Sequence, residues 1–143
     1  MNGNMSLTIE IHTSASKKDL AVIESGLDKF NEESSSVSEV KPIHVIARGE
    51  EGQAHGGAIG RTWGECCEIQ VFWVDSAYRG KGAGSDLLDA FEHEAKNREC
   101  KVIYLSSFTF QAPGFYEKRG YKVVSRIVGF PDRQEKIFLQ KQI

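Results

Sequence analysis

The sequence predicts one α/β (α+β) domain over residues 1–143, with a central mixed, mostly antiparallel sheet and flanking helices. Three observations predict it. Three apolar segments joined by short turns occupy residues 42–74, a helical segment follows a glycine-rich turn at 79–84, and another apolar segment follows that helix. Strands joined by short turns pair antiparallel, whereas strands joined through a helix usually run parallel. A chain of 143 residues, 40% hydrophobic, suffices for one such core.

The N-terminal part predicts a strand, a helix and a loop. Residues 6–12 alternate apolar and polar side chains, as a half-buried strand does. Ser16 lies three residues before Asp19 and can cap a helix that we expect from about Lys17 to Phe30. Its apolar residues recur at helical spacing: Leu20, Ile23, Leu27 and Phe30. Residues 31–39 are polar and serine-rich, which predicts a mobile loop beside a substrate cleft.

The middle of the chain predicts an antiparallel meander followed by a crossover. Its three strands are Pro42–Arg48, Ala54–Trp63 and Cys66–Val74. The helix after Gly84 places its apolar residues on one face: Leu87, Leu88, Phe91 and Ala95. The apolar segment Val102–Leu105 then returns as a strand parallel to the third strand of the meander.

The C-terminal part predicts a short helix and two strands. Pro113–Arg119 fits a helix that ends at Gly120, and Tyr121–Val128 and Lys136–Gln140 fit strands. We expect the last strand to lie at an exposed sheet edge, where it could contribute to a homodimer.

The glycine-rich turn carries the chemistry that the residues themselves suggest. Glycines allow close approach of the backbone to a ligand, and the amide groups at a helix N-terminus bind phosphate oxygens. The turn is Arg79-Gly80-Lys81-Gly82-Ala83-Gly84, in which two cations add countercharge, although such glycines also form plain turns. A Walker motif needs Ser or Thr after its Lys, and a dinucleotide fingerprint needs its third glycine one residue later in a parallel unit. The motif that the turn does match is Arg/Gln-x-x-Gly-x-Gly/Ala, through Arg79, Gly82 and Gly84.

Two motifs together make the chain resemble the GCN5-related N-acetyltransferase (GNAT) family. The first is the turn at 79–84, and the second is Phe-Tyr-Glu-Lys-Arg-Gly-Tyr at 115–121, with Tyr in place of the final Phe that the family carries. The order of elements matches over most of the chain. The resemblance implies a sheet of about six to seven strands, splayed between the fourth and fifth.

The resemblance also implies where acetyl-coenzyme A binds. The pantetheine arm would lie in the splay against the backbone of Phe72, Trp73 and Val74, and an amide of this stretch, at Val74, would hold the tetrahedral oxyanion. The pyrophosphate would lie on the turn, formed by Arg79, Gly80, Lys81, Gly82, Ala83 and Gly84.

Two side chains are the candidate catalytic residues. By resemblance, Tyr116 would donate a proton to the departing thiolate, although a tyrosine can equally fill a seam between helix and sheet. Strict alternation puts Glu68 on one face with Gln70, Phe72 and Val74, so its carboxylate could accept the amine proton directly or through water. A solvated strand glutamate explains Glu68 as well.

Composition narrows the function classes. The net charge of -2, without a Lys/Arg cluster, argues against nucleic acid. We expect no membrane segment, no signal peptide, no metal site and a cytoplasmic location. The expected activity is transfer of an acetyl group from acetyl-coenzyme A to a primary amine, and a small-molecule acceptor is favoured over a protein amine. The alternatives are a non-catalytic acyl-coenzyme A sensor or partner-binding module, and an acyl carrier using Cys66 or Cys67.

Overall fold

A computed structural model describes residues 6–143. Residues 1–5, on which the expectation of no signal peptide depends, lie outside the described part. The chain divides into two compact units, Met1–Ser38 and Glu39–Ile143, and each is described by itself. The single domain over residues 1–143 stays a prediction.

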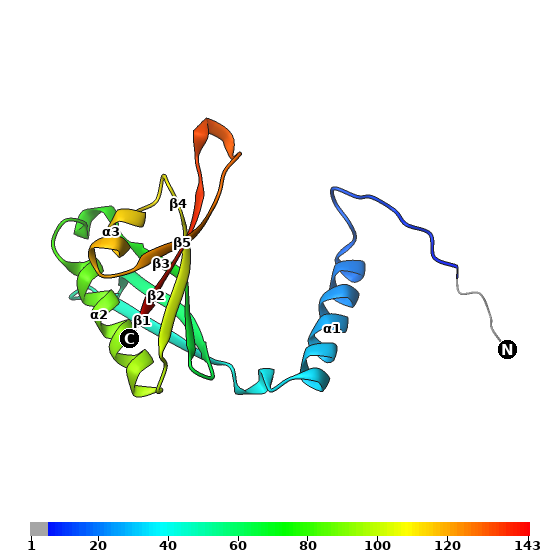
Figure 1. The fold of residues 1–143 in the computed structure, drawn as a ribbon, viewed down its shortest axis with the longest axis horizontal. Helices are drawn as coiled ribbons and strands as arrows, with labels where there is room; N and C mark the ends of the chain where they lie inside the picture. Colours follow the sequence, from blue (N-terminus) through cyan, green and yellow to red (C-terminus); the bar gives the residue numbers. More distant parts are fainter. Residues whose placement is uncertain (1–5) are drawn as a thin grey trace. The chain divides into compact units, whose positions relative to one another are not determined.

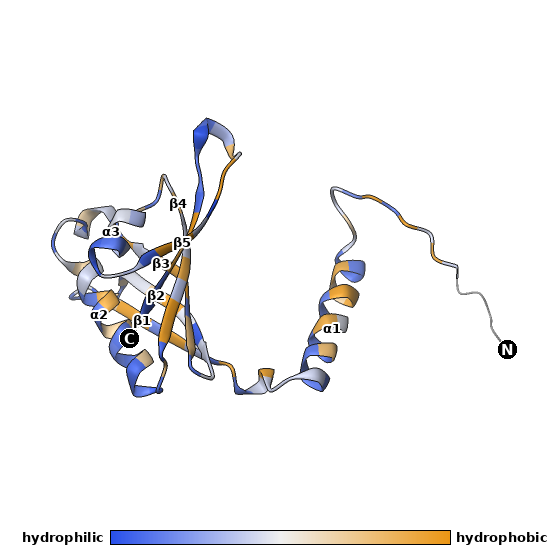
Figure 2. Cartoon of the chain, viewed as in Figure 1, coloured by the Kyte–Doolittle hydropathy of each residue, from blue (hydrophilic) through white to orange (hydrophobic). Residues whose placement is uncertain are grey.

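The described residues of the first unit contain the α-helix α1 (Lys17–Ser34), and a 3-10 turn, η1 (Val37–Glu39), spans the boundary between the two units in the sequence. The side chain of Ser16 accepts a hydrogen bond from the Asp19 amide, as the capping pattern predicts. The helix is longer than predicted and takes in half of the polar loop. Taken by itself, it carries an apolar stripe on one side, and none of its residues is buried (Figure 2).

The strand predicted over residues 6–12 is wrong. The structure gives this segment no strand, and Leu7, Ile9 and Ile11 are exposed. Alternation determines which residues would share a face, but a strand also needs a neighbour that completes its backbone hydrogen bonds. The six strands of the sheet pair only with one another.

The second unit is a six-stranded sheet in the order β1-β2-β3-β4-β6-β5 (Figure 1). Only β3 and β4 pair in parallel, and all other neighbours pair antiparallel, which confirms the predicted meander and crossover. The strands are β1 (Lys41–Arg48), β2 (Ala54–Trp63), β3 (Cys66–Val74), β4 (Val102–Phe108), β5 (Lys122–Ile127) and β6 (Lys136–Gln142).

The core lies between the sheet and two helices, α2 (Ala83–Asn97) and α3 (Pro113–Lys118). Helix α2 packs over β1, β2 and β3 with the apolar face that its spacing predicts. The largest fully buried side chains are Phe91, Leu88, Ile103, Leu139 and Cys67. The fold is therefore the mixed, mostly antiparallel sheet with flanking helices that the sequence predicts.

A β-bulge interrupts the pairing of β2 and β3. The register shifts between Ile59 and Gly60, so Gln70 is an extra residue in β3. A Cβ at Gly60 would lie 1.9 Å from the Glu68 carbonyl oxygen and 2.7 Å from Phe91 Cζ, so this position excludes every other residue. The bulge reverses which side chains of β3 face the helices.

The last strand does not lie at a sheet edge, so its predicted place is wrong. β6 pairs with β4 on one side and β5 on the other, which leaves β1 and β5 as the edges. The reason is that β5 and β6 form a hairpin whose second strand enters the space beside β4. A homodimer stays a prediction, but β6 cannot contribute an exposed edge to it.

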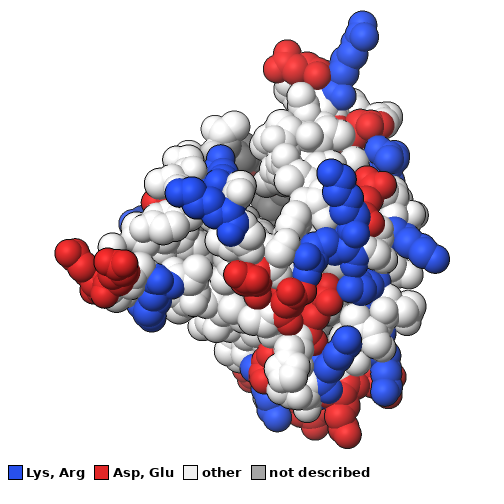
Figure 3. Space-filling model, turned by 90° about the vertical axis from the view of Figure 1, so that its left-hand side faces the viewer, with Lys and Arg blue, Asp and Glu red and all other residues white. Residues whose placement is uncertain are grey.

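The surface mixes charges of both signs. On the face seen in Figure 3, Lys and Arg side chains are interspersed with Asp and Glu. None of the helices that the structure describes is both long and apolar enough to cross a membrane.

Candidate functional site

The central strands β3 and β4 are paired over their first residues and separate over the rest. Their parallel register covers Cys66–Ile69 against Val102–Leu105 and then stops, although both strands continue. On its other edge, β3 stays paired with β2 as far as Val74. The sheet therefore opens between β3 and β4. These are the fourth and fifth strands of the expected order, which counts a strand at residues 6–12, so the opening lies where the resemblance implies a splay.

Backbone alternation decides which groups of β3 face this gap. The Asp75 N–H donates to the His55 carbonyl oxygen of β2 at 2.8 Å. Because alternate residues of a strand direct their amide groups to opposite edges, Trp73 directs its own to β2, whereas Phe72 and Val74 direct theirs toward β4. The Val74 carbonyl oxygen accepts a hydrogen bond from Arg79 Nε at 2.9 Å, so the side chain of Arg79 lies against the end of β3.

The glycine-rich turn leads from this gap into α2. Gly80 and Gly82 have φ values of 74° and 88°, a conformation that favours glycine. Gly82 is the N-cap residue, and its carbonyl oxygen accepts the first helical hydrogen bond from Asp86. The N–H groups of Ala83, Gly84 and Ser85, which precede Asp86, have no partner inside the helix. The turn therefore presents amide donors beside Arg79 and Lys81. Such an arrangement fits a pyrophosphate.

Tyr116 lies in the seam between α3 and β3. Its ring centroid is 5.9 Å from that of Phe72 and 5.7 Å from that of Tyr121, and the side chain is buried. Burial raises the pKa of the phenol to about 12, so it is protonated at neutral pH. A Cβ at Gly84 would lie 3.8 Å from Phe72 Cε1, which places the turn at the same seam.

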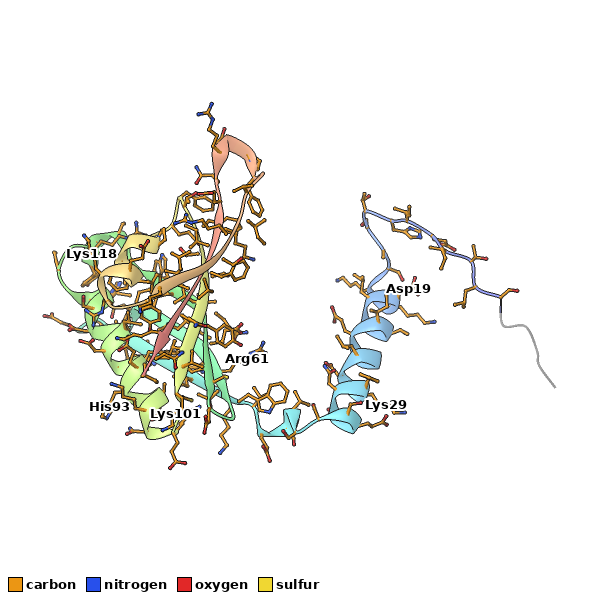
Figure 4. All side chains as sticks on the ribbon, viewed as in Figure 1. Asp19, Lys29, Arg61, His93, Lys101 and Lys118 are labelled. Atoms are coloured by element: carbon orange, nitrogen blue, oxygen red, sulfur yellow. The ribbon has the colours of Figure 1, made fainter. Side chains whose placement is uncertain are left out.

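Glu68 lies on the other face of the sheet, so the single face predicted for Glu68, Gln70, Phe72 and Val74 is wrong. The bulge at Gln70 turns Phe72 toward the helices, while Glu68 Oε1 lies 3.2 Å from Arg61 Nε on β2. Figure 4 shows Arg61 extending from the face opposite α2 and α3. Tyr104 of β4 lies beside Glu68 in the register, and burial, then the Glu68 charge, raises its pKa.

The structure thus brings together Phe72, Val74, the turn and Tyr116 on the helical side of the opening, with Glu68 across the sheet. Their roles stay predictions.

Sequence reasoning missed a second group of residues that holds the start of the turn. His55 Nδ1 lies 3.2 Å from Asp75 Oδ2, and the rings of His55 and Tyr78 are 4.4 Å apart. Asp75 Oδ1 also accepts a hydrogen bond from the Ala77 amide at 3.1 Å. An Asp at the end of a strand is a signal for such a cap, but nothing in the sequence pairs it with His55, twenty residues earlier.

The cysteines and other possible ligand groups are placed as follows. Cys66 is exposed, and Cys67 and Cys100 are buried with raised thiol pKa values, chiefly through burial. Among residues 6–143, no three His, Cys, Asp or Glu side chains come close enough to hold a metal ion.

Comparison with known proteins agrees with this arrangement. Residues 13–121 match the acetyltransferase (GNAT) family. The chain belongs to this family. It is 34% identical over 99 residues to a blasticidin-S acetyltransferase of Streptomyces morookaense, covering 66% of this chain and 73% of that protein.

Two further relatives support the assignment. The chain is 36% identical over 66 residues to a spermine/spermidine N(1)-acetyltransferase of Bacillus subtilis, although only 44% of this GNAT chain and 40% of that protein are covered. A crystal structure of an acetyltransferase from Bacillus cereus superimposes with a TM-score of 0.77 at 28% identity, covering 94% of this chain and 98% of that one.

Proposed function

We propose that this GNAT protein transfers the acetyl group of acetyl-coenzyme A directly to a primary amine of a small molecule. The observation that carries the proposal is the opening of the sheet beyond Ile69 and Leu105, with the Val74 N–H directed into it and the glycine-rich turn at its end. A thioester in this opening and a pyrophosphate on the turn would each meet backbone donors. Relatives named for blasticidin-S and for spermine and spermidine support a small amine as the acceptor.

The proposed reaction assigns one step to each group. The neutral amine nitrogen attacks the thioester carbon, and the carbonyl oxygen, now negative, accepts a hydrogen bond from the Val74 N–H. The oxyanion then re-forms the carbonyl as the carbon–sulfur bond breaks, the departing sulfur takes a proton from Tyr116, and solvent returns a proton to the phenolate. Glu68 takes the proton of the amine, directly or through water.

The two faces of the sheet divide these roles. Tyr116 and the turn lie on the side of α2 and α3, whereas Glu68 lies on the opposite side. Acetyl-coenzyme A would therefore enter from the helical side, and the amine would approach from the other. The Glu68 carboxylate on the acceptor side would also attract a cationic amine, which then loses a proton before it attacks the thioester.

The first experiment combines binding and turnover. Thermal unfolding with and without acetyl-coenzyme A should show a raised midpoint, and thiol release should follow with some members of an amine panel that includes blasticidin S and spermidine. A raised midpoint without turnover on any amine would favour a non-catalytic acyl-coenzyme A sensor. No shift of the midpoint would contradict the proposal.

A single variant tests the turn. Arg79→Ala should weaken acetyl-coenzyme A binding by about 1.5–3 kcal/mol, as expected for a hydrogen bond to a charged group. Arg126→Ala is the matched control, because Arg126 lies on edge strand β5 and pairs with Glu135. Calorimetry that gives the wild-type affinity for Arg79→Ala would remove Arg79 from the binding site.

A further inference from the structure

His55 joins β2 to the segment that precedes the glycine-rich turn. Its carbonyl oxygen accepts from the Asp75 N–H, its Nδ1 lies 3.2 Å from Asp75 Oδ2, and its ring packs on Tyr78. Asp75 in turn caps the short helix η2 (Ser76–Tyr78) through Ala77. These contacts hold the chain just before Arg79.

The other edge of the same ring meets the turn between β1 and β2. A Cβ at Gly49 would lie 2.8 Å from His55 Cδ2 and 2.9 Å from His55 Nε2. This turn is closed by a hydrogen bond from the Gly49 N–H to the Gln53 carbonyl oxygen at 2.8 Å. The imidazole therefore fills the space between two turns, and its position depends on both.

The contact between Asp75 and the ring has a donor and an acceptor side. The Ala77 amide first, and His55 second, hold the pKa of the Asp75 carboxyl below its usual value, so Asp75 is an ionised acceptor. The hydrogen between the two residues then belongs to His55 Nδ1. His55 Nε2 is buried and has no hydrogen-bond partner among the described residues. A buried nitrogen left unpaired is unfavourable, which indicates that the contacts with Asp75 and Tyr78 dominate the placement of the ring.

We propose that His55 is a positioning residue for the binding of acetyl-coenzyme A. It transmits the geometry of the Gly49–Gln53 turn to Asp75 and thereby fixes where Arg79 and the following glycines lie. This inference rests on the proposed function only in that the turn at 79–84 must bind the pyrophosphate. His55 itself belongs neither to that turn nor to the opening between β3 and β4.

One consequence is that a side chain at position 49 should weaken the binding of acetyl-coenzyme A, although this position does not belong to the turn at 79–84. Gly49 has no positive φ, so its backbone accepts alanine. Two side chains oppose a Cβ there: the His55 ring, and Gln53 Nε2 at 2.9 Å, which is the end of a flexible side chain and can move away. A methyl group there would push the imidazole toward Asp75 and displace the cap. The effect of Gly49→Ala on the affinity for acetyl-coenzyme A should therefore require His55.

The experiment measures the Kd of acetyl-coenzyme A by calorimetry and the steady-state rates of the same variants. His55→Phe keeps a ring against Tyr78 and removes the bond to Asp75. It should raise the Kd and the KM for acetyl-coenzyme A about ten- to a hundredfold, the range for one hydrogen bond to a charged group, and leave kcat at saturation and the KM of the amine near wild type.

A double-mutant cycle provides the second measurement. Gly49→Ala should raise the Kd in the wild-type background and leave it unchanged in the His55→Ala background. The clash with the imidazole is then absent, and the remaining contact, with Gln53 Nε2, involves the end of a flexible side chain that can move away. Gly64→Ala is the control: its φ of 60° strains alanine in the β2–β3 turn, so stability should fall while the Kd holds.

The outcomes separate the two proposals. Wild-type protein that binds no acetyl-coenzyme A would contradict the proposed function. Wild-type protein that binds it, with unchanged Kd for both His55→Phe and Gly49→Ala, would overturn the role of His55 alone. If His55→Phe does not fold, the cycle decides, since equal effects of Gly49→Ala in both backgrounds would also overturn it.

Discussion

Tyr116 combines a buried ring with a phenol that holds its proton. Its pKa of about 12 follows from burial alone, without a charged neighbour. A phenol that weakly acidic remains protonated at neutral pH, yet it can still donate a hydrogen bond to a developing thiolate, whose negative charge draws the proton. The aromatic contacts with Phe72 and Tyr121 hold the ring independently of the hydroxyl group.

Replacing Tyr116 with Phe should therefore lower kcat by about 10²-fold, at the lower end of general acid catalysis, with little change in the affinity for acetyl-coenzyme A. Thiol release under saturating substrates measures it. Tyr121→Phe is the control from the same cluster, because its hydroxyl group bonds to Glu92 and should affect stability and not turnover. Equal kcat for wild type and Tyr116→Phe would leave Tyr116 as a packing residue.

At single positions, the sequence predicts the glycine-rich turn better than it predicts which face of β3 each side chain occupies. The turn is defined by a motif, whereas the assignment of faces assumes strict alternation along the strand. The positive φ values at Gly80 and Gly82 agree with a glycine-rich turn. The face of Glu68 could not be obtained, because the bulge arises from the contact of Gly60 with Phe91 and the Glu68 backbone, which only the folded sheet reveals. The contacts of His55 with Asp75 and Tyr78 could not be predicted either, because they join residues about twenty positions apart that only the pairing of β2 with β3 brings together.

At the scale of elements, an ion pair between the buried Glu92 and the partly exposed Lys141 joins α2 to β6. Glu92 is 8% exposed and accepts hydrogen bonds from Tyr121 Oη at 3.0 Å and from Lys141 Nζ at 3.1 Å. Lys141 also lies over the Tyr121 ring, 5.6 Å from its centroid. This network therefore fixes the middle of α2 against β6 and Tyr121.

Lys141→Met should destabilise the protein by about 1–3 kcal/mol, because it leaves the Glu92 carboxylate buried with one neutral donor. Urea denaturation measures the change. Adding Glu92→Gln should recover part of the loss, since the uncompensated charge is then gone. Lys122→Met, an exposed lysine on β5, is the control and should be nearly neutral. A double variant less stable than the sum of the single changes would contradict a stabilising pair.

Element order and type follow from the sequence wherever periodicity and turn residues agree. Helix α2 and the strands from Lys41 to Val74 lie within a residue or two of their predicted ends. The predictions for the N-terminal segment and for the place of β6 in the sheet are wrong, because strand pairing and edge position depend on distant parts of the chain. Alternation around Leu7 carries no information about a partner, and the hairpin that places β6 inside the sheet depends on β4.

For the whole molecule, buried neutral acids link stability to alkaline pH. Burial raises the thiol pKa of Cys67 from 9.0 to about 12, and the pKa values of Cys100 and Tyr121 are raised as well, first of all by burial. The unfolded chain loses these protons at lower pH than the folded one. Stability from Cys67 is therefore fully present below about pH 9 and is lost as the pH rises toward 12.

The free energy of unfolding should be flat from pH 7 to about 8.5 and fall above pH 9, with Cys67 contributing at most about 1.4 kcal/mol per pH unit. Urea denaturation at a series of pH values under reducing conditions measures this slope. Cys67→Ala should flatten the slope most near pH 9, where the thiols of the unfolded chain titrate and its tyrosines are still mostly protonated, even though it lowers stability at neutral pH. Cys66→Ala should leave the slope unchanged, because Cys66 is exposed. A slope that is the same in all three proteins would show that the thiol of Cys67 ionises as easily in the folded chain as in the unfolded one.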